Sequence, residues 1–264
     1  MVIYLPEYLL VFIIGCALGS FLNVVIYRVP KDKSIILPAS YCPKCKRPIK
    51  PWENIPLLSY IIIGGKCVGC GERISLVYPA VEASMGLFAV VLLAHFGWGE
   101  DLLLYGAMTA TLLALSVIDI QTFRLPNRIV LTGAIIAIVL TLLLPNERSF
   151  NERFLSMAFG GLVGLGLLGL MGLFGKLLFR KDTLGMGDVK LAGMMGLYLG
   201  PARTGGMFIL GVFIGAMVGS AMIIAGGKKW GQRIPFGPYL ALGGIISLLW
   251  GESLWRWYLS LVLH

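Results

Sequence analysis

Long apolar segments separated by short polar ones dominate this sequence. The apolar runs, and the glycine, proline and charged breakers between them, predict eight helices near residues 8–27, 78–97, 101–119, 128–144, 154–179, 189–201, 204–226 and 238–261. Several runs approach the roughly 20 residues that a helix needs to cross about 30 Å of hydrocarbon. The segment 189–201 is short for a crossing, so we expect it to be tilted or broken. The pattern predicts an all-α, polytopic membrane helix bundle.

Composition and charge agree with this fold class. Of the 264 residues, 58% are apolar and 13% are charged, which is about half the charged fraction of a soluble protein. The net charge is +9, but the basic residues lie in short loops between apolar runs, so we expect no nucleic-acid binding. The segment before the first apolar run has no basic residue, and that run continues to Tyr27, so the first helix is expected to be retained rather than cleaved.

The placement of Lys and Arg predicts the orientation, because basic loops resist export. With the N-terminus outside, the inner loops hold all but four of the 22 Lys and Arg residues. The four on the outer side are Arg148, Arg153, Arg203 and Arg256. We therefore expect both termini outside, and the loops 28–77 and 226–237 on the cytosolic face together with Asp119 and Asp188.

Four cysteines in the most basic loop indicate a metal site. Cys42 and Cys45 are separated by 21 residues from Cys67 and Cys70, a spacing typical of zinc ribbons in which four thiolates hold one Zn²⁺ ion. Permissive backbone for such knuckles is supplied by glycines at 64, 65, 69 and 71. Four protein ligands leave no position for water, so the zinc is expected to be structural. Two redox-active pairs are the alternative, but no thioredoxin-like βαβ pattern surrounds them.

The cysteine loop is the only extramembrane region long enough for a domain. We therefore divide the chain into a first transmembrane helix at 1–27, a cytosolic four-cysteine zinc module at 28–77 and a transmembrane bundle at 78–264. No sequence repeat is visible across these parts.

Two aspartates stand at the ends of apolar runs. Asp119 closes the run 102–118, and Asp188 precedes the run that starts at Leu191. Ionisable groups at such positions are expensive and tend to be functional. If the bundle brings them together, one carboxyl keeps a proton as general acid while the other draws a proton from water, as in aspartic proteases.

A structural role for these aspartates is the alternative. Asp119 would then pair with Arg124 or Arg128, and Asp188 with Lys190, at the headgroup level. The motif Gly185-Met186-Gly187-Asp188 favours the catalytic interpretation, because its two glycines allow the backbone of a substrate to approach the carboxylate.

Six segments in the same order resemble the bacterial type IV prepilin peptidases, membrane aspartic proteases with a Gly-x-Gly-Asp motif. They are GSFLNVVIYRVP at 19–30, YCPKCKRPIKPWENIPLLSYIIIGGKCVGCGERIS at 41–75, YPAVE at 78–82, DIQTFRLPN at 119–127, GMGDVKLAG at 185–193 and IPFGPYLALGG at 234–244. Together they span almost the whole chain.

The resemblance implies a bifunctional enzyme of the bacterial inner membrane. Asp119 and Asp188 would be the catalytic pair that cleaves prepilin or pseudopilin leaders after a glycine at the cytosolic face. The enzyme would then methylate the new N-terminus with S-adenosylmethionine, with Glu53 and Glu82 as candidates for holding the amine or the methyl donor. Candidate substrate-pocket residues are Gly185, Gly187, Pro235, Phe236 and Gly237.

Several residues and the overall function admit a second interpretation. Pro235, Phe236 and Gly237 also fit a turn that starts the last helix. Asn23 and Arg28 lie in a family segment, but a helix–helix hydrogen bond and a topogenic charge explain them equally well. Alternative functions are a transporter that relays ions through the aspartates, or a non-catalytic assembly factor that docks through the zinc module. Membrane lipid is the surrounding partner, and the oligomeric state is not determined by the sequence.

Overall fold

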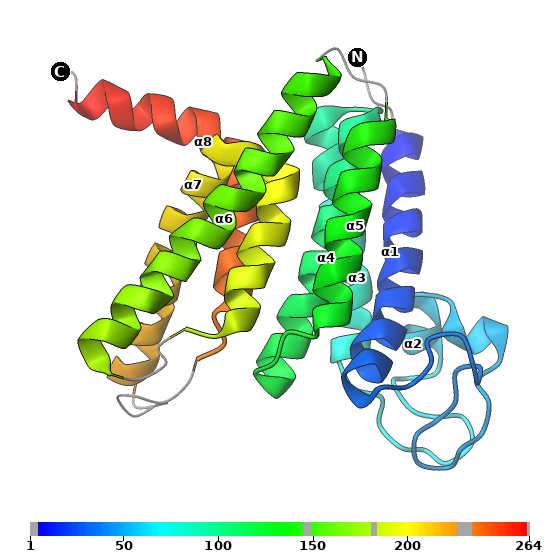
Figure 1. Ribbon diagram of the computed structural model, residues 1–264. Coiled ribbons are helices and arrows are strands. Elements are labelled where there is room, and N and C mark those ends of the chain that lie inside the picture. The colour runs from blue at the N-terminus through cyan, green and yellow to red at the C-terminus, as the bar shows by residue number, and fades with distance from the viewer. Residues whose placement is uncertain (1–4, 145–148, 181–183, 226–233, 263–264) are drawn as a thin grey trace. The chain divides into compact units, whose positions relative to one another are not determined.

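The computed structural model describes residues 5–144, 149–180, 184–225 and 234–262 (Figure 1). Within these ranges the regular structure is helical, and the only β pairing is two isolated bridges. Five helices are long and apolar enough to cross a membrane. They are Leu5–Lys31, Val77–Phe96, Glu100–Thr122, Phe150–Leu178 and Met186–Ile224. The chain forms two compact units, Met1–Ala114 and Leu115–His264.

The first unit is built on a close pair of helices, α1 (Leu5–Arg28) and α3 (Val77–Phe96). Glycines bring the two backbones together: a Cβ added to Gly15 would lie 2.8 Å from the Cα of Gly86. A Cβ added to Gly19 would likewise lie 2.7 Å from the Cα of Glu82. Small residues at such positions let helices in a membrane gain van der Waals contact, because the hydrophobic effect does not drive their association there. Helix α4 (Glu100–Thr122) begins in this unit.

The four-cysteine module, residues 29–76, connects the end of α1 to the start of α3. It holds two 3₁₀ turns, η1 (Val29–Lys31) and η2 (Pro51–Asn54), and one short helix, α2 (Leu58–Ile62). The two antiparallel bridges pair Tyr41 with Pro48 and Lys66 with Arg73, so each one closes one cysteine knuckle. Only short local structure forms between the end of α1 and the start of α3.

The second unit contains α5 (Asn127–Leu143), α6 (Phe150–Phe179), α7 (Met186–Ile224) and α8 (Gly237–Val262), together with the last turns of α4. Helices α6 and α7 touch through their backbones, since a Cβ on Gly196 would collide with the carbonyl oxygen of Gly160. On the other face of α7, the Tyr198 hydroxyl donates to the carbonyl of Gly133 in α5 at 2.8 Å.

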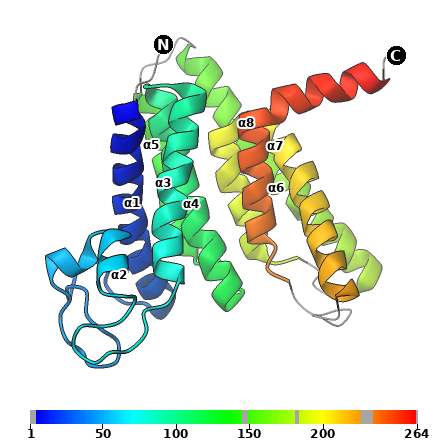
Figure 2. The same ribbon diagram turned by 180° about the vertical axis from the view of Figure 1, so that it is seen from behind.

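Helix α7 is a hairpin of two helices. Its 39 residues correspond to about 58 Å of α-helix, far more than one crossing needs. The backbone leaves the helical region at Gly200 (φ 71°, ψ 173°), and Pro201 follows. Met195 and Met207, on opposite sides of the break, both reach Gly244 of α8, which a straight helix does not allow. Figures 1 and 2 show the two halves running in opposite directions.

The structure confirms the predicted fold class, an all-α membrane helix bundle, and places a helix at each of the eight predicted segments. The predicted segments 189–201 and 204–226 are the two halves of α7. The expectation that 189–201 is associated with a break is met at Gly200. Helix α5, with 17 residues, is shorter than the five candidate spans. The sequence prediction missed α2, and much of the predicted loop 226–237 lies outside the described residues.

Candidate active site and metal centre

The two Cys-x-x-Cys segments fold into knuckles with the same backbone hydrogen bonds. In the first, the Cys42 N–H donates to Arg47 O at 2.9 Å and the Lys46 N–H donates to Cys42 O at 2.9 Å. In the second, Cys67, Glu72 and Gly71 make the equivalent bonds at 2.8 Å. The residue after the second cysteine has positive φ in both knuckles: 61° at Lys46 and 70° at Gly71. Each knuckle is therefore built to turn two cysteine side chains to the same side.

The four sulfurs gather at one point and suit a tetrahedral metal. All lie within 4.8 Å of one another, and none is in a disulfide. The Sγ atoms of Cys42 and Cys70 are 3.9 Å apart, as are those of Cys45 and Cys67. A tetrahedron with metal–sulfur bonds of about 2.3 Å has edges of about 3.8 Å, so the cluster has the dimensions of a four-cysteine zinc site.

Backbone N–H groups of the knuckles favour the thiolate form that binds metal. Those of Cys70 and Gly69 point at the sulfur of Cys67 and lower its pKa to about 6. The equivalent groups in the first knuckle lower the pKa of Cys42. The local fold thus favours the thiolates of Cys42 and Cys67, whereas burial and the neighbouring sulfurs raise the pKa of Cys70 to about 11. The four-sulfur geometry and the ligand type fit zinc.

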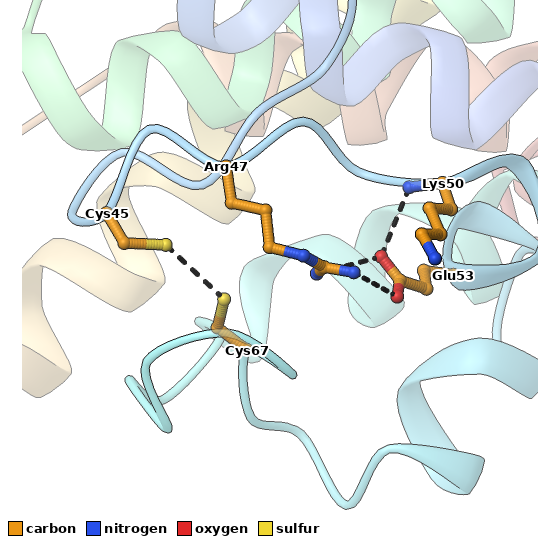
Figure 3. Close-up of polar contacts among 5 residues, drawn as sticks. All are labelled: Cys45, Arg47, Lys50, Glu53 and Cys67. Carbon is orange, nitrogen blue, oxygen red and sulfur yellow. Dashed lines mark hydrogen bonds and ion pairs between the residues drawn. The ribbon is translucent and has the colours of Figure 1, made fainter.

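An arginine links the cluster to the rest of the module (Figure 3). The guanidinium of Arg47 donates two hydrogen bonds to the carboxylate of Glu53, at 2.7 and 3.1 Å. Its positive charge also acts on the sulfurs of Cys45 and Cys67. The pKa of Glu53 is held below its usual range by Arg47 and further by the Lys50 N–H, which donates to Glu53 Oε2 at 3.1 Å. The structure therefore gives Glu53 a bonding role within the module, which the sequence did not reveal.

The close contact of Arg47 with the second knuckle explains one of the predicted glycines. A Cβ at Gly69 would lie 2.8 Å from Arg47 Cδ, so the arginine stem occupies the space of a side chain there. A second cation, Lys44, forms an ion pair with Glu72, which lies beside the second knuckle. Two cations therefore brace the cluster: Lys44, directly before Cys45, and Arg47, two residues after it.

Polar residues of the α1–α3 pair face the module. Asn23 donates to the carbonyl of Tyr78 at 3.0 Å, a bond between the two helices. Arg28 is buried and donates to the carbonyls of Ser34 and Pro38 at 3.0 and 2.7 Å, which fixes the loop that follows α1. Glu82 is buried, and its Oε2 accepts a hydrogen bond from the Leu57 N–H at 2.8 Å.

The second unit carries the two aspartates. Asp119 lies in the last turns of α4 and is 5% exposed. Its Oδ2 accepts a hydrogen bond at 3.1 Å from the N–H of Gly237, the first residue of α8. The first N–H groups of a helix have no partner within it, so Asp119 satisfies one of these donors and lies at the positive end of α8.

Asp188 stands at the start of another helix. It is the third residue of α7, half-buried, and its Oδ2 would lie 3.1 Å from a Cβ added to Gly185. Its negative charge is close enough to that of Asp119 for the two to repel. Each carboxylate therefore occupies the N-terminal end of a helix, where the backbone dipoles favour negative charge.

Leu125 lies close to two of the predicted pocket glycines, Gly187 and Gly237. A Cβ added to Gly187 would lie 3.1 Å from Leu125 Cβ, and a Cβ added to Gly237 would lie 3.6 Å from Leu125 Cδ2. The same Cβ on Gly237 would lie 2.9 Å from Asp119 Oδ2. Three segments distant in sequence thus meet around one leucine. The sequence analysis did not identify Leu125, because a single apolar residue in the connection between α4 and α5 carries no chemical signal.

The alternative ion pairs of the aspartates are not formed within the described part of the chain. There, no cation makes a salt bridge with either aspartate. The ammonium of Lys190 instead donates to Asn127 Oδ1 at 3.0 Å, which joins the start of α7 to the start of α5.

The predicted pocket residues divide into two groups. Gly185, Gly187 and Gly237 lie next to the carboxylates or to Leu125. Pro235 and Phe236 precede α8, and the Phe236 carbonyl accepts hydrogen bonds from Tyr239 and Leu240 at 3.1 Å each. The turn that starts the last helix is therefore present. Of the three described residues Pro235, Phe236 and Gly237, only Gly237 bonds to an aspartate.

Comparison with known proteins covers both the cysteine cluster and the aspartates. The family model described as the bacterial peptidase A24 N-terminal domain matches residues 13–96, and the type IV leader peptidase family matches residues 106–220. A protein of Pseudomonas aeruginosa named prepilin leader peptidase/N-methyltransferase is 35% identical, over 97% of each chain. Proteins of the same name in Aeromonas salmonicida and Bacillus subtilis are 35% and 33% identical, over 96% of this chain and 94% and 98% of theirs.

No solved structure matches the chain significantly. The relatives are similar over almost their full length, and the two family models cover the four-cysteine module and both aspartates between them. The chain therefore belongs to the type IV leader peptidase family.

Proposed function

We propose that this protein cleaves the leader peptide of type IV prepilins or pseudopilins after a glycine and then methylates the new N-terminus. The observation that carries the peptidase assignment is the approach of two carboxylates, each at a helix N-terminus, beside glycines that leave room for a substrate backbone. Relatives named as peptidase and methyltransferase support this function over a transporter or an assembly factor.

The chemistry follows from charge repulsion between Asp119 and Asp188. Two adjacent carboxylates do not both ionise readily, so the pair holds one proton near neutral pH. The ionised member accepts a proton from water as the water attacks the peptide carbonyl, and the protonated member donates to the substrate. The two groups titrate together, so neither is assigned permanently as acid or base.

The glycines around the pair give the substrate access. Gly185 borders the Asp188 carboxylate, and Gly237 donates its N–H to Asp119. A larger side chain at either position would enter the space beside a carboxylate. An extended substrate backbone needs that space to bring its carbonyl within hydrogen-bond distance of both acids.

The expected substrate geometry agrees with a site at the end of a membrane bundle. We infer that the site faces the cytosol of a bacterial inner membrane, because nearly all Lys and Arg fall on that side in the predicted topology. A prepilin has a short basic leader before a long apolar helix, so its scissile bond would lie at the cytosolic boundary of the membrane. The substrate then needs no extraction from the bilayer.

We also propose that the four cysteines hold a structural zinc ion. Their four sulfurs complete a tetrahedron, so the metal would stabilise the module and would not activate water. The methyl group would come from S-adenosylmethionine. Among described residues only the Leu57 N–H bonds to the Glu82 carboxylate, which leaves Oε1 to meet a cationic amine or sulfonium. Glu53 is committed to Arg47, so its role would be to position the module.

The test is a cleavage assay in lipid nanodiscs with a model prepilin, with products identified by mass spectrometry. Asp119→Asn and Asp188→Asn are each expected to lower the rate by about 1,000-fold or more, because the remaining carboxyl has no partner for proton exchange. Membrane insertion and zinc content should not change. The control is Glu252→Gln, which alters an exposed carboxylate elsewhere in the unit. Undiminished cleavage by either aspartate variant would refute the proposed dyad.

A further inference from the structure

A row of apolar side chains along one edge of the four-cysteine module is exposed. Between residues 52 and 62 it includes Trp52, Ile55, Leu58, Ile61 and Ile62, with 44% to 79% of each side chain accessible. Three of the five belong to α2, whose buried member is Ser59. Helix α2 therefore turns its small polar residue inward and its large apolar residues outward, the reverse of a helix in water.

A hydrogen bond fixes the start of α2 at one level along helix α3. The N–H of Leu57, the residue before α2, donates to Glu82. Glu82 lies five residues into α3, or about 7.5 Å along its axis. Glu82 also packs against Gly19, which lies nine residues, or about 13 Å, before the end of α1. The start of α2 is thus level with residues inside the two spanning helices.

The backbone around Leu57 is shaped to hold α2 in this place. Leu57 adopts φ 59° and ψ −49°, a conformation that residues with a side chain rarely adopt. Such a turn persists where surrounding contacts require it, and here the bond to Glu82 does so. Both ribbon views show α2 beside the last turns of α1 and lying across their direction (Figures 1 and 2).

The charge of the module identifies what lies around this edge. Residues 29–76 contain eight Lys and Arg against three Asp and Glu, a clear basic excess. Lys50 lies over the ring of Trp52, with Nζ 5.1 Å from the ring centroid, so a cation and an interfacial aromatic side chain adjoin the apolar row. Apolar side chains bordered by basic ones match an acyl layer bordered by anionic headgroups.

We propose that α2 is an interfacial helix that anchors the four-cysteine module to the membrane. Leu58, Ile61 and Ile62 enter the acyl region of the leaflet next to the module, and the basic side chains of the module contact anionic phospholipid headgroups. Helix α1 is a candidate membrane span with exposed apolar side chains at Leu18 and Phe21, and α2 lies beside its last turns (Figures 1 and 2). The anchor keeps the module at a constant height above the spanning helices.

The test places a photoreactive amino acid, p-benzoylphenylalanine, at position 62 of the full-length protein in nanodiscs. After irradiation, mass spectrometry measures phospholipid adducts. The matched control is position 68, because Val68 is similarly exposed at 61% but lies on the second knuckle. We expect phospholipid adducts at position 62 to exceed those at 68 by about ten-fold or more. Both substitutions replace exposed residues, so neither depends on a change in the core.

Lipid composition distinguishes the two parts of the interaction. Adducts at position 62 should persist in pure phosphatidylcholine and rise about three-fold or more with phosphatidylglycerol, because basic groups draw the module toward an anionic surface. Equal phospholipid yields at positions 62 and 68 would overturn the membrane anchor. Cross-links from position 62 mainly to a second copy of the chain would also overturn it. Yields that do not respond to phosphatidylglycerol would refute the electrostatic part.

Discussion

The four-cysteine cluster and the two aspartates both concentrate negative charge, but the protein stabilises that charge differently at each. The cluster is flanked by fixed cations, Lys44 and Arg47, each held in place by a glutamate. In the described structure the aspartates have no such cation and lie instead at the N-termini of α7 and α8. The partial charges there favour an anion more weakly than a guanidinium does.

The difference fits what each site has to do. A structural metal site keeps its charge constant, so permanent cations beside it only add stability. A general acid–base pair has to gain and lose a proton, and a cation in direct contact would keep both carboxyls ionised. Helix N-termini stabilise one negative charge without preventing protonation. The contrast predicts that the cysteine module responds mainly to charge changes and the aspartate site mainly to displacement of its helices.

The largest expected effect on the cysteine module is the loss of one thiolate. Cys45→Ser should reduce bound zinc from about one per chain to below about 0.1, because three ligands no longer enclose the ion and the module has little other core. Metal analysis of purified protein measures this directly. Cys16→Ala is the matched control, because Cys16 lies in α1 away from the cluster and should keep full zinc content. Stoichiometric zinc in Cys45→Ser would show that Cys45 is not a ligand.

A smaller but still substantial effect is expected where α7 touches α6. Gly196→Ala would drive a methyl group into the Gly160 carbonyl, so the helix that carries Asp188 must shift. Overpacking of this kind costs about 1–3 kcal/mol, and cleavage should fall with thermal stability in detergent. Gly166→Ala is the control on α6, since nothing lies within 4 Å of its added Cβ. If the two variants melt and cleave alike, close backbone packing does not position Asp188.

The next smaller effect is expected from the arginine beside the cluster. Arg47→Met keeps much of the stem over Gly69 but removes the charge and both hydrogen bonds to Glu53. Residues that contact the metal ligands typically contribute 10- to 100-fold to metal affinity. We therefore expect the affinity of the module for zinc to fall about ten-fold. Chelator competition monitored by metal release gives the value. An unchanged affinity for zinc would show that Arg47 only connects parts of the module and does not stabilise the bound metal.

The smallest expected effect compares the two knuckles. Lys46 has φ 61°, whereas the equivalent residue of the second knuckle is Gly71 with φ 70°. Lys46→Gly should relieve about 1 kcal/mol of backbone strain and raise the thermal stability of the module slightly. Gly71→Ala should have the opposite sign, because it introduces a side chain at positive φ. Calorimetry measures the melting temperature of each variant. Equal shifts in melting temperature for Lys46→Gly and Gly71→Ala would contradict the equivalence of the two knuckles.

The sequence predicted the helices well because their apolar runs are long and end at clear breakers. It also predicted the cysteine cluster, since the spacing of the ligands nearly determines their geometry. Helix α2 was missed because a segment of five residues inside a basic loop is too short to show a periodic signal. The bond from Gly237 to Asp119 joins residues 118 positions apart, so only the tertiary fold reveals it. The partners Arg47 and Leu125 are ordinary residue types whose importance comes from their neighbours.

The break in α7 bears on how the chain is inserted into a membrane as it is made. Because Pro201 directly follows Gly200, the two arms are joined without a hydrophilic loop that would have to be exported. Arg203 is the only charged residue between Lys190 and the end of α7, so few charges must pass through hydrocarbon when both arms enter together. Biosynthesis of the hairpin as one unit would deliver Asp188 and the far end of α7 to the same side of the bilayer in a single step.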